Sequence, residues 1–506
     1  MKILLELRPA LDGFSGVPQE TRLLFRGLRL IDSIEVEGLI QHGARIISQG
    51  LPNKKRFFKA DLSRHNKINK LSRLVISLQE KPYGTLFDEI FRFIDKKFLV
   101  LRLVCMIHLG IKLTLGVFES ELFKDFIWQT WFYKTLPVSD FDLVCTANFR
   151  VLKAPTSLLQ QAGLQNRLLM GYAKYIFIDT SEFKIMISQT PFPGRITQGT
   201  TLVVRYHDAI PILMPHTIKD KSLHQASHFY ALHSNVKDGA YFACVSEASR
   251  QDLISIFPEA ESKALVIYNM VSHHYFDAES PRDRVTEIIR SRVYSDNGVE
   301  FKLLSPHQRE ILYRQKTDNL EVSDFSYLLI VSSIEPRKNH LRLLAAWEIL
   351  KSGIYSNLKL VIIGELGWHY AQILSAFLPW MDRGELFMLN SVPAADLRVL
   401  YKHAEATVCP SLAEGFDFSG VEAMRSGGAV VASDINVHRE IYDNASEYFN
   451  PYSTEEAVNA ISRVIESGCE EHRQALIKRG AEVSKRYMPD VVLPKWKSFL
   501  DSLNCV

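Results

Sequence analysis

The sequence predicts an α/β protein with two doubly wound parallel sheets. Three observations lead to this prediction. Short apolar runs alternate with segments of helical periodicity in both halves of the chain. Several of these runs end directly at polar or glycine residues, as buried parallel strands do. The length of 506 residues also exceeds what one hydrophobic core usually supports, which favours two domains or more.

The N-terminal half shows the alternation with interruptions. An apolar strand is expected at residues 1–7, and a glycine turn and a helix at 19–30 follow it. Further strands are expected at 201–206, 240–245 and 264–268.

The C-terminal half is more regular. Strand and helix signals follow one another with short connections, which indicates a parallel sheet with crossover helices. The expected strands are 326–331, 358–363, 386–389, 406–409 and 429–433, and the expected helices are 339–351, 368–377, 394–403 and 421–426.

These elements divide the chain into two domains and a connection. We expect an N-terminal domain at 1–270, interrupted by an insertion around 50–140. A polar connecting segment is expected at 271–320 and a C-terminal domain at 321–487. The last helix, at 488–506, is expected to pack back on the first domain.

Composition excludes several classes of protein. A net charge of +3 is close to neutral and argues against a general nucleic-acid binder. Six scattered cysteines without a CxxC pair favour a reducing cytosol over a disulfide framework or a zinc site. The apolar run at the N-terminus is too short for a secretion signal. We therefore expect a cytoplasmic protein.

A membrane surface is the one extended partner that the sequence suggests. The apolar run 98–118 contains Arg102, His108 and Lys112, which oppose a spanning helix and favour a buried or interfacial one. A basic run at 54–73 is either a solvated face or a patch that binds anionic lipid. Aromatic residues extend this region to 98–133, as core residues or as interfacial anchors. The basic side chains are Lys54, Lys55, Arg56, Lys59, Arg64, Lys67, Lys70 and Arg73.

Two glutamates, Glu414 and Glu422, stand out in the C-terminal half. A loop joins them between an expected strand and an expected helix, at the carboxyl end of a parallel strand where such sheets bind ligands. Carboxylates there are costly unless they meet polar ligand groups.

A second motif is basic and occupies an equivalent position. Arg337 and Lys338 follow the expected strand 326–331 and precede a helix, whose N-terminus attracts anions. Two cations beside a helix N-terminus suit a diphosphate.

Together these motifs resemble the family-4 retaining glycosyltransferases of the GT-B fold. The resemblance is strong over 326–451 and weaker, but in the same order, in the N-terminal half. The motifs are Ile334 to His340, Gly364 to Trp368, Leu400 to Ala404, Glu414 to Glu422, and Ala432 to Ile435.

The resemblance implies two Rossmann-like domains with a cleft between them, and roles for named residues. Arg337 and Lys338 would bind the diphosphate, Glu422 the ribose and Glu414 the donor sugar, and His207 would lie near that sugar. The catalytic set is then Glu414, His207, Lys338 and Arg337. The nucleotide-sugar set is Gly13, Gly16, Arg337, Lys338, Gly364, Val392, Glu414, Gly415, Phe416, Asp417, Phe418 and Glu422.

Four positions keep a second interpretation. Gly13 and Gly16 permit close approach to a ligand or form a plain surface turn. His207 is a cleft residue or a structural histidine. Asp417, where the family commonly differs, contacts a sugar hydroxyl or caps the following helix. The family also often carries an arginine where this chain has Ser332 and Ser333.

The expected function is transfer of a hexose from a nucleotide diphosphate sugar to a glycan or lipid-linked glycan, with retention and without a metal or cofactor. The Glu-Pro-Arg-Lys-Asn variant resembles mannosyl- and rhamnosyltransferases of surface polysaccharide assembly, so GDP-mannose is favoured over a UDP-sugar as donor. The alternatives are a sugar-nucleotide epimerase of the same fold and an inactive sugar-nucleotide-binding scaffold. A nicotinamide dehydrogenase is disfavoured, since no GxGxxG follows the first strand.

Overall fold

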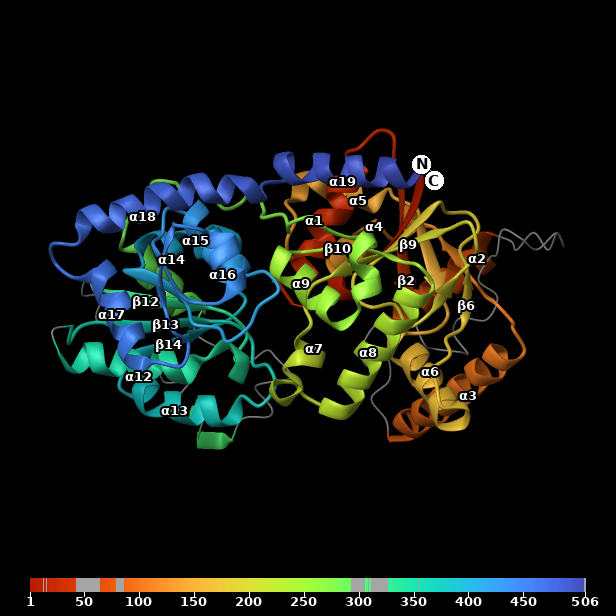
Figure 1. Cartoon of the computed structure of the whole chain (residues 1–506), viewed down its shortest axis with the longest axis horizontal. Helices are drawn as coiled ribbons and strands as arrows, with labels where there is room; N and C mark the ends of the chain where they lie inside the picture. The colour runs from red at the N-terminus through yellow and green to blue at the C-terminus, as the bar shows by residue number, and fades with distance from the viewer. Residues whose placement is uncertain are drawn as a thin grey trace.

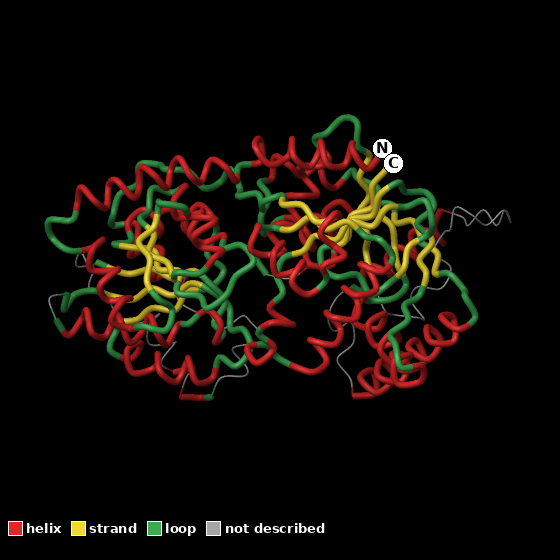
Figure 2. Tube along the Cα trace, in the orientation of Figure 1, coloured by secondary structure: helices red, strands yellow, loops and turns green. Residues whose placement is uncertain are grey.

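The computed structural model of the chain describes residues 1–11, 13–14, 16–41, 64–78, 86–292, 305–307, 309–310, 326–353 and 355–504. Two β-sheets with helices around them lie side by side along the long axis of the molecule (Figure 1). The strands form two separate groups, with helices outside both (Figure 2). This arrangement confirms the predicted α/β class with two doubly wound sheets.

The first sheet has eight strands in the order β11-β10-β9-β7-β1-β2-β5-β4. Neighbouring strands are parallel except β4 and β5, so the carboxyl ends of the others share one edge. Its strands are β1 (Lys2–Glu6), β2 (Glu35–Gln41), β4 (Gly116–Phe118), β5 (Phe149–Leu152), β7 (Ile185–Ser188), β9 (Thr201–Tyr206), β10 (Tyr241–Cys244) and β11 (Ala264–Val266).

The helices of this half surround the sheet, and a small sheet of β3 (Leu113–Thr114), β6 (Phe177–Asp179) and β8 (Arg195–Ile196) lies beside it. The described helices are α1 (Val17–Arg29), α2 (Arg64–Ser77), α3 (Leu86–His108), α4 (Lys124–Ile127), α5 (Phe141–Cys145), α6 (Thr156–Met170), α7 (Ile210–Leu213), α8 (Lys221–Lys237) and α9 (Glu247–Ile256).

The second sheet has six parallel strands in the order β14-β13-β12-β15-β16-β17. They are β12 (Tyr327–Val331), β13 (Lys359–Ile363), β14 (Leu386–Leu389), β15 (Ala406–Cys409), β16 (Val430–Ser433) and β17 (Ser446–Phe449). The helices that follow the first half are α10 (Arg284–Arg292), α12 (His340–Ser352), α13 (Ala371–Asp382), α14 (Ala394–His403), α15 (Phe418–Arg425), α16 (Asn436–Tyr442), α17 (Thr454–Ile465), α18 (Glu470–Val483) and α19 (Pro489–Asn504).

The strands of the second sheet read as continuous apolar runs because helices cover both of its faces. Leu328 and Ile330 of β12 point into one hydrophobic cluster, and Leu329 points into another. Successive side chains of a strand face opposite sides, so a strand in the middle layer must be apolar at every position.

The chain passes between the two halves at two places that touch. Met270 packs in the core around β1 and α1, whereas Val271 packs with the second sheet. Tyr487 packs with the second sheet, and Val492 of α19 returns to the first core. The Val271 amide donates a hydrogen bond to the Tyr487 carbonyl at 2.8 Å, which fixes the two crossings side by side.

The structure corrects two expected elements. Helix α15 begins at Phe418, not at Val421, so Glu422 lies inside the helix. The apolar run 98–118 is not one helix, because α3 ends at His108 and Gly110 has a positive φ.

The aromatic and basic residues expected to bind a membrane near that run have different positions in the structure. Trp128, Trp131 and Phe132 are buried in the first core, so these aromatic residues are not interfacial anchors. The basic residues at 54–59 lie outside the described part of the chain. Among the described helices, none is long and apolar enough to cross a membrane.

A buried ion pair ties three parts of the first half together. Arg205 of β9 and Glu20 of α1 are fully buried, with their side-chain nitrogen and oxygen 2.9 Å apart. Arg205 also donates to the Ile267 carbonyl at 2.5 Å and to Asn269 at 2.7 Å, and it lies over the Trp496 ring of α19. The guanidinium is therefore surrounded by partners that compensate for its removal from water.

We expect Glu20→Ala to lower the free energy of unfolding by about 3 to 5 kcal/mol, because it leaves the Arg205 charge buried without its carboxylate. The control is Asp238→Ala, which breaks the partly exposed Arg195–Asp238 pair and costs at most about 1 kcal/mol. Urea unfolding of both variants measures the difference. Equal losses would contradict the role given to the buried pair.

Candidate active site

The two predicted cations and the first predicted glutamate form one cluster. Arg337 and Lys338 lie in a short 3-10 turn between β12 and α12, at the carboxyl edge of the second sheet. Arg337 donates to Glu414 at 2.9 Å, to Glu335 at 2.7 Å and to the Ala413 carbonyl at 2.6 Å. The Lys338 ammonium lies 2.5 Å from the other Glu414 oxygen. Glu414 thus bridges both cations.

The charges of this cluster hold one another ionised. Burial by itself would raise the pKa of Glu414, but the charges of Arg337 and Lys338 outweigh it, so that pKa lies below its usual value. Burial raises the pKa of Asp208 at the end of β9, against the opposing charge of Arg337. Asp208 belongs to the first half of the chain, so this field extends across the boundary between the halves.

Gly415 lies where the two halves meet. A β-carbon at this position would lie 1.8 Å from the His207 carbonyl oxygen, far inside contact distance, so no side chain fits. Ser246 donates a hydrogen bond to the Gly415 carbonyl at 2.8 Å, and Ser249 donates to the His207 carbonyl at 2.9 Å. The segment after β9 and the loop after β15 are therefore in direct backbone contact.

His207 is neutral in this position. Burial and the charge of Arg205 lower the pKa of its imidazole to about 3. Its Nε2 atom has no hydrogen-bond partner among the described residues. The ring can therefore donate or accept one hydrogen bond at neutral pH, but it does not carry a charge.

Glu422 has different hydrogen-bond partners from Glu414. It is buried and accepts hydrogen bonds from Gln19 at 2.9 Å, from Tyr401 at 3.3 Å and from Tyr275. Burial raises the pKa of Glu422 to about 7, although these hydrogen bonds oppose the rise. Because Gln19 belongs to α1, Glu422 is a second direct link between the halves.

Asp417 shows one of its two predicted roles. It is the N-cap of α15 and accepts hydrogen bonds from the Ser419 amide at 3.0 Å and hydroxyl at 2.6 Å. His438 of α16 lies 3.3 Å from its other oxygen. Burial would raise the pKa of Asp417, but His438 and Ser419 lower it below the usual value. No motif pointed to His438, whose ring reaches Asp417 only through the packing of α16.

Phe416 and Phe418 flank Asp417 and pack inward. Their rings meet edge to face, with centroids 5.0 Å apart. Val392 is buried in the same hydrophobic cluster. Phe416, Phe418 and Val392 thus anchor the loop between β15 and α15 in the hydrophobic core.

The remaining predicted glycines have different reasons for being glycine. A β-carbon at Gly364 would lie 1.9 Å from the Ser332 carbonyl oxygen, so β13 and the turn after β12 pack too closely for a side chain. Gly16 precedes α1 with φ of 70°, a conformation that favours glycine. Gly13 has open space, and a β-carbon there would lie 3.9 Å from a Glu365 carboxylate oxygen, so it faces the second half of the chain.

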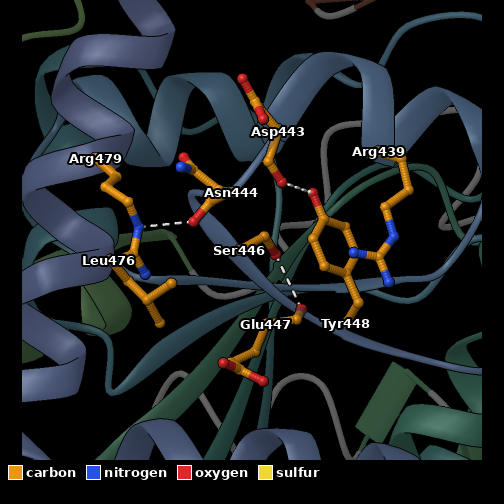
Figure 3. A pocket seen from close by; sticks show the side chains of 8 residues that line it. All are labelled: Arg439, Asp443, Asn444, Ser446, Glu447, Tyr448, Leu476 and Arg479. Carbon is orange, nitrogen blue, oxygen red and sulfur yellow. Dashed lines mark hydrogen bonds between the residues drawn. The ribbon is translucent and has the colours of Figure 1, made fainter.

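A separate surface concavity lies away from this cluster (Figure 3). Its labelled side chains come from α16, β17, α18 and the turn between α16 and β17, and they include none of the predicted site residues. Arg479 donates to the Asn444 carbonyl, and Tyr448 donates to the Asp443 carbonyl. Arg439 forms two hydrogen bonds with Asp434. The arginines here are therefore already paired.

Comparison with known families agrees with this geometry. Residues 314–483 match the model of the "Glycosyl transferases group 1" family. This range contains the cation turn, Glu414 and Glu422. The C-terminal part of the chain, residues 314–483, is therefore similar to the group 1 glycosyl transferases. Enzymes of this family are retaining and metal-independent.

Relatives of this chain include O-antigen chain mannosyltransferase B of Escherichia coli, with 30% identity over 163 residues, 32% of this chain and 42% of the relative. O-antigen chain mannosyltransferase RfbU of Salmonella typhimurium is 35% identical over 82 residues, 16% of this chain and 23% of the relative. The matches thus span less than half the length of either relative.

Two solved structures share the fold of this chain. Sucrose-phosphate synthase of Thermosynechococcus elongatus has a TM-score of 0.50 at 12% identity, over 71% of this chain and 84% of that one. Anabaena Alr3699/HepE, solved with UDP and glucose, has a TM-score of 0.50 at 17% identity, over 73% of this chain and 90% of that one. The GT-B architecture expected from the motifs is confirmed.

We expect Gly415→Ala to destabilise the protein, because its methyl group would overlap the His207 carbonyl oxygen and neither backbone can move freely. The control is Gly384→Ala, which has φ of 66° and open space, and so carries only the left-handed backbone cost of about 1 to 2 kcal/mol. Calorimetry should show the greater loss for Gly415→Ala. A smaller loss than in the control would refute the tight contact.

The raised pKa of Glu422 predicts a pH effect on stability. Below about pH 4.5 the carboxyl is protonated in both the folded and the unfolded chain. Between about 4.5 and 7 only the unfolded chain releases the proton, so the free energy of unfolding falls as pH rises and stays lowered above about 7.

Glu422→Gln removes this ionisation and should stabilise the ligand-free chain by about 3 kcal/mol more at about pH 8 than at about pH 4. Chemical unfolding at both pH values measures the difference. The glutamine side chain has nearly the shape of the glutamate it replaces. Any effect of the substitution on packing is the same at both pH values and cancels in their difference. A gain that does not depend on pH would show that Glu422 titrates normally.

Proposed function

We propose that the protein transfers a hexose from a nucleotide diphosphate sugar to a glycan or lipid-linked glycan, with retention of configuration. The observation that carries the proposal is the cluster of Arg337, Lys338 and Glu414 at the carboxyl edge of the second sheet, with His207 and Asp208 of the first sheet across from it. Parallel sheets bind ligands at this edge.

The cations have a defined task in such a transfer. As the bond from the sugar to the diphosphate breaks, negative charge develops on the departing phosphate oxygen. Arg337 and Lys338 are held within a few ångströms of one another by Glu414, so they are positioned before a donor arrives. Prepositioned charges stabilise the developing charge without a reorganisation cost.

The two glutamates are suited to different parts of the donor. Glu414 is ionised and lies beside the cations, where its oxygens can accept hydrogen bonds from sugar hydroxyls. Glu422 lies deeper, with Gln19 and two tyrosines around it, and is assigned to the ribose. A ribose hydroxyl would replace one of these present partners.

The transfer itself needs no strong base from the protein. We assign a front-side displacement: the acceptor oxygen bonds to the anomeric carbon, the bond to the diphosphate breaks, and the acceptor proton passes to a phosphate oxygen. The neutral imidazole of His207 can orient a hydroxyl by a hydrogen bond and does not take the proton.

Mannose from GDP-mannose is the donor that we propose. The Glu335-Pro336-Arg337-Lys338-Asn339 turn and the similarity to two O-antigen chain mannosyltransferases support it. The acceptor would then be a growing surface polysaccharide, reached from the cytoplasm at the inner face of the plasma membrane.

We expect GDP to raise the melting temperature more than UDP, because a ligand of the native state stabilises it. Lys338→Ala should abolish this shift and lower the transfer rate at least about a hundredfold, and Glu414→Ala should lower the rate similarly. The matched control is Lys351→Ala, which breaks another lysine–glutamate pair, with Glu385, at the end of α12 far from the cation turn.

Near-normal transfer by both site variants would sink the assignment. Conversion of the sugar nucleotide without any acceptor would identify an epimerase instead. Nucleotide binding without turnover across a panel of acceptors would identify a binding subunit.

A further inference from the structure

One face of α3 exposes a continuous row of apolar side chains. Ile90, Ile94, Phe98, Leu101 and Leu109 have exposed fractions from 42% to 73%, and Cys105 in the same row is also exposed. Their spacings of three and four residues place them along one side of a helix and its extension. The apolar stripe is defined as Ile90, Ile94, Phe98, Leu101, Cys105 and Leu109.

The stripe is a second apolar face and not part of the core. The opposite side of α3 is already buried, with Leu99, Leu103 and Ile107 in a cluster that includes Leu159 and Ala162 of α6. Figure 1 shows α3 at the outer edge of the first half, beyond α6 and away from the second sheet. Contiguous exposed apolar surface of this kind marks an interaction site.

Positive charges border the stripe. Lys97 and Arg102 are exposed on α3 on either side of the stripe, and Lys112 is exposed just beyond the helix. Among the described side chains of α3, Asp95 is the one carboxylate, and it is half-buried. The described charges of this helix are therefore mostly positive. An apolar stripe with basic flanks is the pattern of a helix that lies in the interface of an anionic bilayer.

The same charges disfavour a second copy of this chain as the occupant. Two copies meeting stripe to stripe would bring Lys97 and Arg102 of each close to those of the other, and like charges repel. An anionic lipid surface instead attracts every one of them.

We propose that α3 docks the protein on an anionic membrane surface, with the apolar stripe in the boundary between headgroups and acyl chains. Because none of the described helices can cross a bilayer, the contact is peripheral. The inference goes beyond the proposed transfer reaction and depends on neither donor nor acceptor. It places the contact at residues 90–112, which overlap the expected range 98–133.

Vesicle co-sedimentation of the full chain without substrates tests the proposal. The vesicles are phosphatidylcholine with and without phosphatidylglycerol, at low and high salt. The wild-type chain should bind the phosphatidylglycerol vesicles at low salt. Phe98→Gln/Leu101→Gln should weaken this binding at least about tenfold, because burial of two large apolar side chains is lost.

The matched control is Leu223→Gln/Ile349→Gln, which changes two apolar residues of similar exposure on α8 and α12 and should bind as wild type does. Gln retains helix propensity, so all variants should fold, which their melting temperatures check. Lys97→Gln/Arg102→Gln should weaken binding about fivefold for each charge removed, and only with phosphatidylglycerol present.

Three outcomes would overturn the proposal: no wild-type binding to phosphatidylglycerol vesicles at low salt, equal binding by the stripe variant and its control, or a wild-type dimer in sedimentation that the stripe variant converts to a monomer. The last outcome would assign the stripe to a second copy. Loss of glycosyl transfer with vesicle binding intact would leave this proposal standing and remove the proposed function alone.

Discussion

The close backbone contact between Gly415 and His207 is the constraint on which the site depends. Two open parallel sheets can present their carboxyl edges to one another at many distances and angles. Here one loop from each sheet meets without any side chain between them, and Ser246 and Ser249 donate hydrogen bonds to the two carbonyls. Buried carbonyl oxygens need such donors. The contact sets how far Glu414 lies from the first half.

Electrostatics gives different charge states to Glu414, in the loop before α15, and Glu422, inside that helix. Glu414 is ionised because two cations outweigh its burial, whereas Glu422 keeps its proton up to about neutral pH because hydrogen bonds alone oppose its burial. The same residue type therefore has two different charge states within one site. The difference arises from neighbours that come from other elements.

Much of the fold could be predicted because parallel sheets have strong local signals. β9 and α14 occupy the expected residues, since their apolar pattern and bordering residues agree. The strands β2, β5 and β7 were not predicted, because their residues carry no distinct turn signals and their partners are distant in the sequence. The N-terminal end of α15 was misplaced because its cap, Asp417, is also a loop residue.

The site residues, like the elements of the fold, were predictable from the sequence only in part. Motif spacing could predict that Arg337, Lys338 and Glu414 belong together, because each follows a strand of one sheet. It could not predict Gln19, Tyr275 or His438 as neighbours of the predicted carboxylates. Those contacts depend on how helices and halves pack, and no local pattern encodes that geometry.

The hydrogen bond between Val271 and Tyr487 has a mechanical consequence. The two segments of chain that join the halves are fastened to each other at this point, so they act as one narrow joint. Two separated connections would resist bending, whereas a single joint permits rotation of one half against the other with few torsion changes. Other contacts between the halves, such as that of Gln19 with Glu422, then oppose that rotation. A ligand that replaces one of these contacts changes the resistance to rotation of the halves while the Val271–Tyr487 hydrogen bond stays in place.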